Sequence, residues 1–133
     1  MASSLFNPGR EGFLDGSIDY DTDDIRVMLV KSTYTYDATD KFLSDLGSVD
    51  NGRSAALSSK TVTDGIADAA DTSLTATSAV ACNALILFKH TGSDATARVI
   101  CYIDTATGLP ITPAAGGAVS IAWDNGSNKI FNL

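Results

Sequence analysis

The densest group of side chains that could do chemistry is the stretch DYDTDD, which holds four carboxylates within six residues. Asp19, Asp21 and Asp23 alternate like the first three oxygen ligands of an EF-hand calcium loop. Such a loop also needs glycine at its sixth position and a closing glutamate at its twelfth, where this chain has Asp24 and Val30. An EF-hand is therefore excluded. A looser cation site with a distant ligand stays open, but the pattern favours a solvated entrance to the strand that follows.

Nucleophilic catalysis and cofactor chemistry find little support elsewhere in the chain. His90 is the only histidine, and the stretch FKHTG places it at the end of an expected strand beside a turn. The sequence has no GxSxG nucleophile elbow, and its glycine-rich stretches lack the lysine and hydroxyl residue of a phosphate loop. One histidine and two cysteines are too few for a zinc site. We therefore expect no enzyme activity, no catalytic residue, no metal and no cofactor.

The two cysteines are expected to be structural. Cys82 and Cys101 each lie in an apolar stretch, ACNALILF and ARVICYI, where a free cysteine packs as a small hydrophobe. The N-terminus MASSLFNPGREGF lacks the basic and apolar segments of a secretory signal, so we expect folding in a reducing cytoplasm. Disulfides are not expected there.

Charge and composition narrow the range of partners. The formal net charge is −7, and the nine Lys and Arg residues are scattered and form no basic stripe. We therefore expect no nucleic-acid partner. Hydrophobic residues make up 44% and charged residues 19% of the chain, which indicates a folded protein. No apolar run approaches the roughly 20 residues that cross a bilayer, so no membrane partner is expected. The 133 residues fit one domain, 1–133.

The elements that must position these side chains begin with a short helix in FNPGREGFLDG. Asn7 is its expected cap and Gly16 its left-handed end, with Phe13 and Leu14 facing inward. Residues 18–24 then alternate apolar and acidic side chains, which predicts an extended segment whose carboxylates point at water.

The rest of the chain reads as short strands with turn-rich links. A second helical turn is expected in DATDKFLSDLG, capped by Asp37 and ended by Gly47. One hairpin is expected around TGSDAT and another around Asn125-Gly126. The expected strands are 25–31, 58–63, 65–68, 72–77, 82–90, 97–104, 118–124 and 129–132. Together they predict a mostly β fold, a β-sandwich of jelly-roll type with one or two short helices near the N-terminus.

The strand at 97–104 is apolar on both faces. Val99, Cys101 and Ile103 are expected to face one way, and Ile100 and Tyr102 the other. One face belongs to the core, and the other must be covered by the N-terminal helix, a second sheet or a neighbouring subunit.

Exposed aromatic side chains could form a sugar-binding platform. Tyr34, Tyr36, Tyr102 and Trp123 are available for one. Trp123 shares a strand face with Ile121, which favours core packing or a subunit contact for that residue.

Two long stretches share their pattern with a known family. The first, LFNPGREGFLDGSIDYDTDDIRVMLVKSTYTYDATDKFLSDL, combines a short helix, an apolar strand and an aromatic turn. The second, CYIDTATGLPITPAAGGAVSIAWDNGSNKIFNL, combines a GLPxTP turn with a W-D-N-G hairpin and an apolar end. The chain thereby resembles small virion structural proteins of tailed bacteriophages, over residues 5–46 and 82–133.

The resemblance implies a capsid decoration (cement) protein, made in the host cytoplasm and bound to the outer capsid surface of the virion. Such a protein would stabilise the mature shell by bridging subunits of the major capsid protein. An acidic β domain fits that outer surface better than a DNA-facing lumen. Icosahedral symmetry allows trimers or dimers, and we favour a homotrimer. The alternative is a tail-fibre or receptor-binding β-module that recognises host surface carbohydrate.

The candidate contact residues are apolar and lie near the two ends of the chain and on the strand at 97–104. They are Leu5, Phe6, Ile100, Tyr102, Ile130, Phe131 and Leu133. Residues 1–17, the N-terminal arm with its short helix, are a candidate docking segment. The sequence leaves open whether these side chains form an interface or the core of the chain itself.

Overall fold

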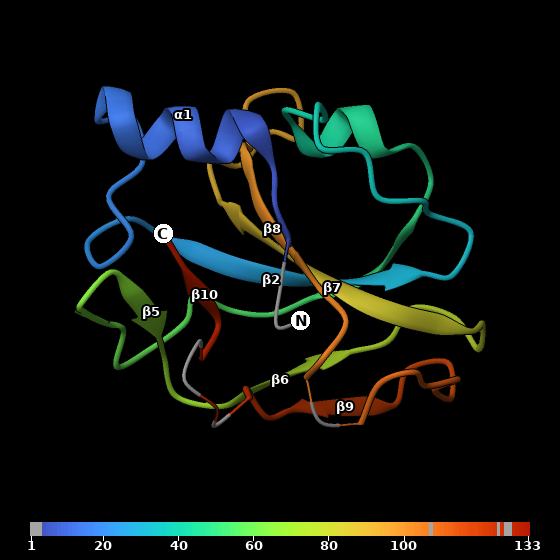
Figure 1. Ribbon diagram of the computed structural model, residues 1–133. Coiled ribbons are helices and arrows are strands. Elements are labelled where there is room, and N and C mark those ends of the chain that lie inside the picture. Colours follow the sequence, from blue (N-terminus) through green and yellow to red (C-terminus); the bar gives the residue numbers. More distant parts are fainter. Residues whose placement is uncertain (1–3, 107, 125, 127–128) are drawn as a thin grey trace.

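The structure is a computed structural model that describes residues 4–106, 108–124, 126 and 129–133. It is mostly β-structure, with antiparallel sheets and one α-helix, as the sequence predicts (Figure 1). The main sheet has five strands in the order β1, β8, β7, β2, β3. These strands are β1 (Ser4–Leu5), β8 (Val99–Ile103), β7 (Cys82–Lys89), β2 (Ile25–Lys31) and β3 (Asp50–Arg53).

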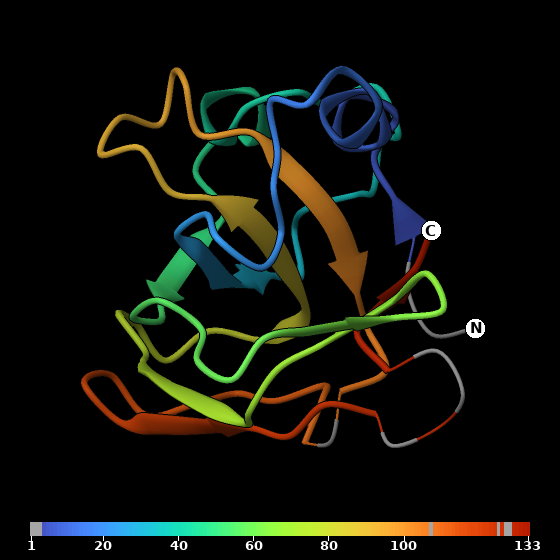
Figure 2. The same cartoon turned by 90° about the vertical axis from the view of Figure 1, so that its left-hand side faces the viewer.

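Two smaller sheets lie on one side of the main sheet, and the helix lies on the other (Figures 1 and 2). The three-stranded sheet has the order β10 (Phe131–Asn132), β5 (Ile66–Asp68), β4 (Thr61–Thr63). The two-stranded sheet pairs β6 (Thr72–Thr75) with β9 (Ala118–Ile121). Among the described residues, no helix combines the length and the apolar character needed to cross a membrane.

The main sheet separates two hydrophobic clusters. The sheet-side core fills the space toward the smaller sheets, and the loop-side core lies under the segment 34–49. The sheet-side core includes Ile25, Val27, Leu29, Leu85, Leu87, Ile100, Cys101, Leu74, Val119, Trp123 and Phe131. The loop-side core consists of Phe6, Met28, Val30, Tyr34, Leu43, Leu46, Val49, Ile86, Phe88, Ala97 and Val99. The chain itself therefore covers both apolar faces of the strand at 97–104, with its smaller sheets on one side and residues 34–49 on the other.

Strand β8 departs from the alternation that its sequence predicts. The β7–β8 hairpin is confirmed, with Leu87 opposite Cys101 and Phe88 opposite Val99, so Ile100 is an extra residue in the ladder. This β-bulge shifts the alternation by one position. Ile100 therefore joins Cys101 in the sheet-side core, whereas Val99 lies in the loop-side core. The predicted grouping of Val99 with Cys101 is wrong for this reason.

Helix α1 (Asn7–Asp15) rests on β8 through its glycines. A Cβ on Gly9 would lie 2.8 Å from the carbonyl oxygen of Ile100, so only glycine allows this close approach. Gly16, with φ +81°, ends the helix as predicted. Phe6, and not Asn7, occupies the N-cap, and no side chain caps the first turn. Because the buried face runs through the glycines, Leu14 points away and is 87% exposed, contrary to the sequence-based prediction.

The second helical turn is a short 3-10 helix, η1 (Leu43–Leu46), and it starts later than predicted. Asp45 caps it, because its carboxylate accepts the backbone N–H of Phe42 at 2.9 Å. Asp37, the predicted cap, instead accepts the backbone N–H of Thr39 within its own turn.

The predicted C-terminal hairpin is absent from the described residues. Strand β9 pairs with β6, and β10 pairs with β5, where Phe131 lies opposite Ala67. Asn125 of the predicted turn lies outside the described residues. The two ends of the expected hairpin therefore belong to different sheets, and each finds its partner in the middle of the chain.

Candidate functional site

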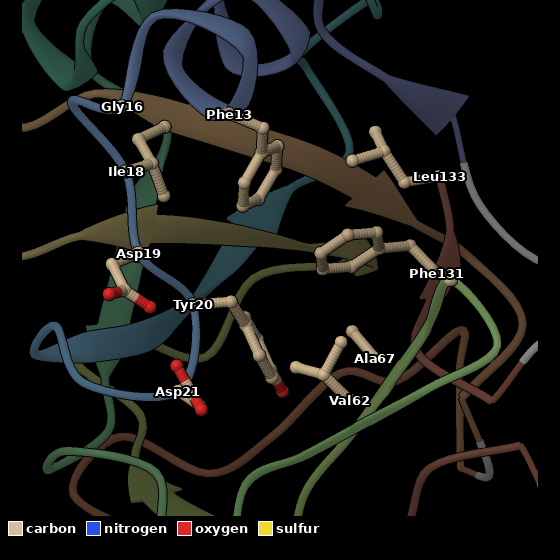
Figure 3. Close-up of a pocket in the computed structure, with 11 residues that line it drawn as sticks. Phe13, Gly16, Ile18, Asp19, Tyr20, Asp21, Val62, Ala67, Phe131 and Leu133 are labelled. Atoms are coloured by element: carbon tan, nitrogen blue, oxygen red, sulfur yellow. The ribbon is translucent and has the colours of Figure 1, made fainter.

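A pocket of about 430 Å³ opens between the end of α1, the loop that follows it, the β4–β5 hairpin and the C-terminus (Figure 3). It gathers side chains from three distant parts of the sequence. Its lining residues are Phe13, Gly16, Ile18, Asp19, Tyr20, Asp21, Val62, Gly65, Ala67, Phe131 and Leu133.

The floor of the pocket is a packed aromatic cluster. The rings of Tyr20 and Phe131 meet edge to face, with centroids 5.5 Å apart and an interplanar angle of 89°. Phe13 lies 5.6 Å from Phe131 between ring centroids. The Tyr20 hydroxyl donates to the carbonyl oxygen of Asp68 at 2.9 Å, and burial raises the pKa of this phenol. The floor therefore presents ring surface whose one hydroxyl is already engaged.

Two aliphatic side chains stand at the mouth of the pocket in contact with water. Val62 is 57% exposed and Leu133 is 59% exposed. The backbone N–H of Leu133 donates to the carbonyl oxygen of Gly65 at 2.8 Å, which holds the last residue beside the β4–β5 hairpin. Exposed apolar side chains around an apolar pocket are typical of a surface that binds a ligand or another protein.

Asp19 and Asp21 form the acidic part of the rim. A hydrogen bond between their side chains lowers the pKa of Asp19 and raises that of Asp21, which also feels the negative charge of Asp19. Hydrogen bonds from Thr22 lower the pKa of Asp19 further. The pair therefore holds on to one proton more readily than an isolated aspartate would, because that proton is shared between the two carboxylates and relieves their repulsion.

The other two carboxylates of the stretch DYDTDD are used inside the protein. Asp23 lies 3.1 Å from the ammonium of Lys89, and it accepts the backbone N–H of Asp19. Asp24 receives two hydrogen bonds of 3.0 Å from Arg26. Within the described residues, no group of three or more His, Cys, Asp or Glu side chains is placed to hold a metal ion.

The remaining candidate residues for chemistry lie apart from the pocket. His90 is half-buried, and its backbone N–H donates to the carbonyl oxygen of Asp24. Cys82 and Cys101 are free thiols buried in the sheet-side core, which confirms the prediction of buried hydrophobes. Burial raises the pKa of Cys101, so its thiol is a poor nucleophile.

The seven predicted contact residues fall into two groups. Tyr102 is half-buried and Leu133 is exposed, so both keep surface for a partner. The others are buried in the chain's own core: Leu5, Phe6, Ile100, Ile130 and Phe131. Contacts with a partner stay a prediction for Tyr102 and Leu133, and Phe131 contributes to the pocket floor.

Three of the four aromatic residues considered for a sugar platform come together, away from the pocket, and the fourth lies in the other core. Tyr34 and Tyr36 pack against Tyr102, with ring centroids 6.0 and 5.5 Å away, beside the loop-side core. Trp123 is buried in the sheet-side core, and its indole N–H donates to the carbonyl oxygen of Ala70. The core packing predicted for Trp123 is confirmed.

Comparisons of this chain with protein-family models, with curated proteins and with solved structures find no match. Its function has to be inferred from its own residues.

Proposed function

We propose that the protein is a non-enzymatic capsid decoration (cement) protein. It binds the outer surface of a phage head and bridges subunits of the major capsid protein. The resemblance of residues 5–46 and 82–133 to small tailed-phage virion proteins motivates this proposal. The structural observation that carries it is the open apolar pocket, because both stretches contribute to its wall and the second leaves Leu133 exposed at its mouth, beside Val62 of the middle segment.

Attachment would stabilise the shell by mass action. A protein that binds the mature lattice and not its dissociated subunits shifts the equilibrium toward the assembled state, and the shift grows with the logarithm of its free concentration once the sites are mostly filled. Covering the exposed side chains of Val62 and Leu133 contributes about 25 cal/mol for each Å² of apolar surface removed from water. Many weak attachments of this kind, repeated over a lattice, suffice without any turnover.

The finer structural assignments belong to the same proposal. A main sheet facing two smaller sheets is compatible with a β-sandwich, and we propose the jelly-roll type. We also propose that the protein acts as a homotrimer at local threefold positions of the outer capsid surface, after synthesis in the host cytoplasm.

The second candidate is a tail-fibre or receptor-binding module for carbohydrate. One observation favours it: an aromatic floor beside two carboxylates is a common arrangement for binding a sugar ring, which stacks on the aromatic face and donates its hydroxyls to acids. Saturable binding on a glycan array, together with a pocket-confined response to the same sugar, would put this candidate first.

The copy number in purified particles tests the decoration proposal. Quantitative mass spectrometry with labelled peptides measures this polypeptide relative to the major capsid subunit. We expect a ratio of the same order as one copy per subunit or per few subunits. A count of a few copies per particle would contradict a shell-wide role and point to the tail.

A further inference from the structure

The pocket is divided into an apolar interior and an acidic rim. Phe13, Phe131 and Ala67 line its interior, and the one phenol in the floor already donates to a backbone carbonyl. A polar group placed deep in this pocket would lose its hydrogen bonds to water and gain few in return. The part of a ligand that enters the pocket must therefore be apolar.

The acidic rim of the pocket favours a positively charged group on the ligand. The ion pairs of the described residues use Asp23, Asp24, Asp50 and Asp94, and none uses Asp19 or Asp21. These two carboxylates lie next to each other at the mouth of the pocket (Figure 3). The net charge of −7 adds a long-range attraction for cations. The part of a ligand that stays at the rim must therefore be cationic.

A lysine of the chain already shows this chemistry beside the pocket. The Lys60 ammonium lies 5.9 Å from the centroid of the Tyr20 ring and donates to the carbonyl oxygen of Asp23. Its charge also lowers the pKa of Asp21. The acidic loop and its aromatic ring thus accept an ammonium group within the folded chain, and Lys60 competes with any cation that arrives from outside.

We propose that this pocket binds a basic side chain, an arginine or lysine, presented by a protein partner. The methylene stem lies across the apolar mouth against Val62 and Leu133, and the cationic head meets Asp19 and Asp21 at the rim. Arginine and lysine are the side chains that combine an apolar stem with a charged end. An arginine can also bind both carboxylates through its fork of donors. The identity of the partner as a capsid subunit rests on the proposed function, whereas the chemistry of the pocket does not.

A direct test uses small probes on the isolated protein. Acetyl-arginine methylamide is titrated into ¹⁵N-labelled protein, and the amide shifts of Asp21, Gly65 and Ala67 are followed by NMR. Acetyl-citrulline methylamide is the neutral control of nearly equal shape. We expect saturable shifts confined to the pocket, and binding of citrulline at least about tenfold weaker, as loss of one charge-assisted contact implies. Equal binding of the two probes would overturn the proposal.

Three variants that each remove one charge sharpen the test. Asp21→Asn should weaken arginine binding about fivefold to tenfold, whereas Asp104→Asn, which removes the same charge from an exposed position outside the pocket lining, should leave it unchanged. Lys60→Gln should strengthen binding, because it removes the competing cation. Equal effects of the two aspartate variants would show a general charge effect and contradict a defined site.

Shell binding separates this inference from the proposed function. Asp21→Asn and the wild-type protein are compared for coating of purified shells. Weaker coating by Asp21→Asn supports a capsid basic side chain in the pocket. Unchanged coating overturns that assignment while decoration stands. Failure of the wild-type protein to coat shells overturns the proposed function, and the probe titration still decides the chemistry of the pocket.

Discussion

The two faces of the main sheet are covered in different ways. Over the sheet-side core the cover consists of strands, whose backbone groups pair with each other in ladders. Over the loop-side core it is the segment 34–49, whose one helix is the four-residue η1 and which is held by isolated backbone hydrogen bonds, such as Leu43 N–H to the carbonyl oxygen of Ala97, and by side chains. A cover without a continuous ladder must find scattered partners for its polar groups, and here single backbone hydrogen bonds supply most of them and tyrosine hydroxyls add others.

Particular contacts of the loop-side cover show this. The Tyr34 hydroxyl donates to Asp40 at 2.8 Å, and the Tyr36 hydroxyl donates to the carbonyl oxygen of Leu5 at 2.7 Å. At the rim of the same core, the guanidinium of Arg53 lies 5.6 Å from the ring centroid of Phe88. We infer that the strand cover keeps its position when a core side chain beneath it is shortened, whereas the loop cover can move to fill the cavity.

The largest effect is expected from two neighbours on β7 that point to opposite faces. Leu87 and Ile86 are both fully buried, one in each core. Leu87→Ala should lower the free energy of unfolding by about 4 kcal/mol and Ile86→Ala by about 2 kcal/mol, because the loop cover can close over a cavity more readily. Urea denaturation followed by Trp123 fluorescence measures both. Equal losses would contradict the proposed difference between the covers.

The attachment of the strand cover is tested at Gly52. This residue has φ +128°, and a Cβ there would lie 2.3 Å from the carbonyl oxygen of Thr75 on β6. Gly52→Ala should destabilise the protein by about 2 kcal/mol or more. Gly16→Ala is the control, because its φ is also positive but the space around it is open, so about 1 kcal/mol is expected. Similar losses for both variants would show that the close approach to β6 contributes nothing.

The side-chain anchoring of the loop cover is tested at Tyr36. Tyr36→Phe removes one hydroxyl and leaves the carbonyl oxygen of Leu5 without that donor, at an expected loss of about 1 kcal/mol. Tyr102→Phe is the matched control, since no hydrogen bond of its hydroxyl is seen among the described residues. Thermal denaturation compares the two variants, and an equal response would show that the hydroxyl does not anchor the cover.

The smallest effect concerns the ion pair of Arg53 with Asp94, two hydrogen bonds of 2.8 Å at a half-exposed site. Asp94→Asn should cost less than about 1 kcal/mol, and less again in high salt. The hydrogen bonds from Arg53 lower the pKa of Asp94. A lowered folded-state pKa stabilises the fold above the ordinary value of 3.8, and this stability is lost as the pH falls through the lowered value.

Denaturation curves of the wild type and of Asp94→Asn between pH 7 and pH 2 check the sign. The two proteins should converge at the acid end. A difference that grows as the pH falls would contradict the assignment.

Local patterns predicted the elements that local physics decides. Strand β2 spans residues 25–31 as predicted, because its β-branched run has clear polar limits. The β7–β8 hairpin follows from two apolar runs around a turn, and the end of α1 follows from Gly16. Each of these signals lies within a few residues of the element that it determines.

The pairing of strands that lie far apart in the chain could not be predicted from the sequence. The W-D-N-G stretch has the composition of a hairpin turn, yet β9 pairs with a strand 43 to 49 residues earlier and β10 with one 64 to 66 residues earlier. No local signal in the sequence indicates either pairing. The bulge at Ile100 was missed because an extra residue in a uniformly apolar strand leaves no trace in its composition.

The pocket was missed for the same reason. The alternation of residues 18–24 correctly turned Tyr20 inward and Asp19 and Asp21 outward, but the predicted extended segment is wrong beyond that point. The chain turns there, the Asp23 N–H donates to the carbonyl oxygen of Asp19, and Thr22 is exposed. Phe131 and Leu133 were singled out as contact residues. What the sequence lacked was the pairing of β10 with β5, which brings the C-terminus to the acidic loop.

Because Cys101 is completely buried, chemical modification of its thiol can report rare opening of the folded protein. A small alkylating reagent can reach that thiol only when the main sheet separates from the smaller sheets, so the rate of its modification in native buffer counts those separations. Cys82 lies at the first position of β7, where its sulfur accepts a hydrogen bond from Asn51 at 3.2 Å. Its modification would report fraying of that end of the strand. Mass spectrometry of the two labelled peptides would thus measure the rates of local and of global opening in the wild-type protein.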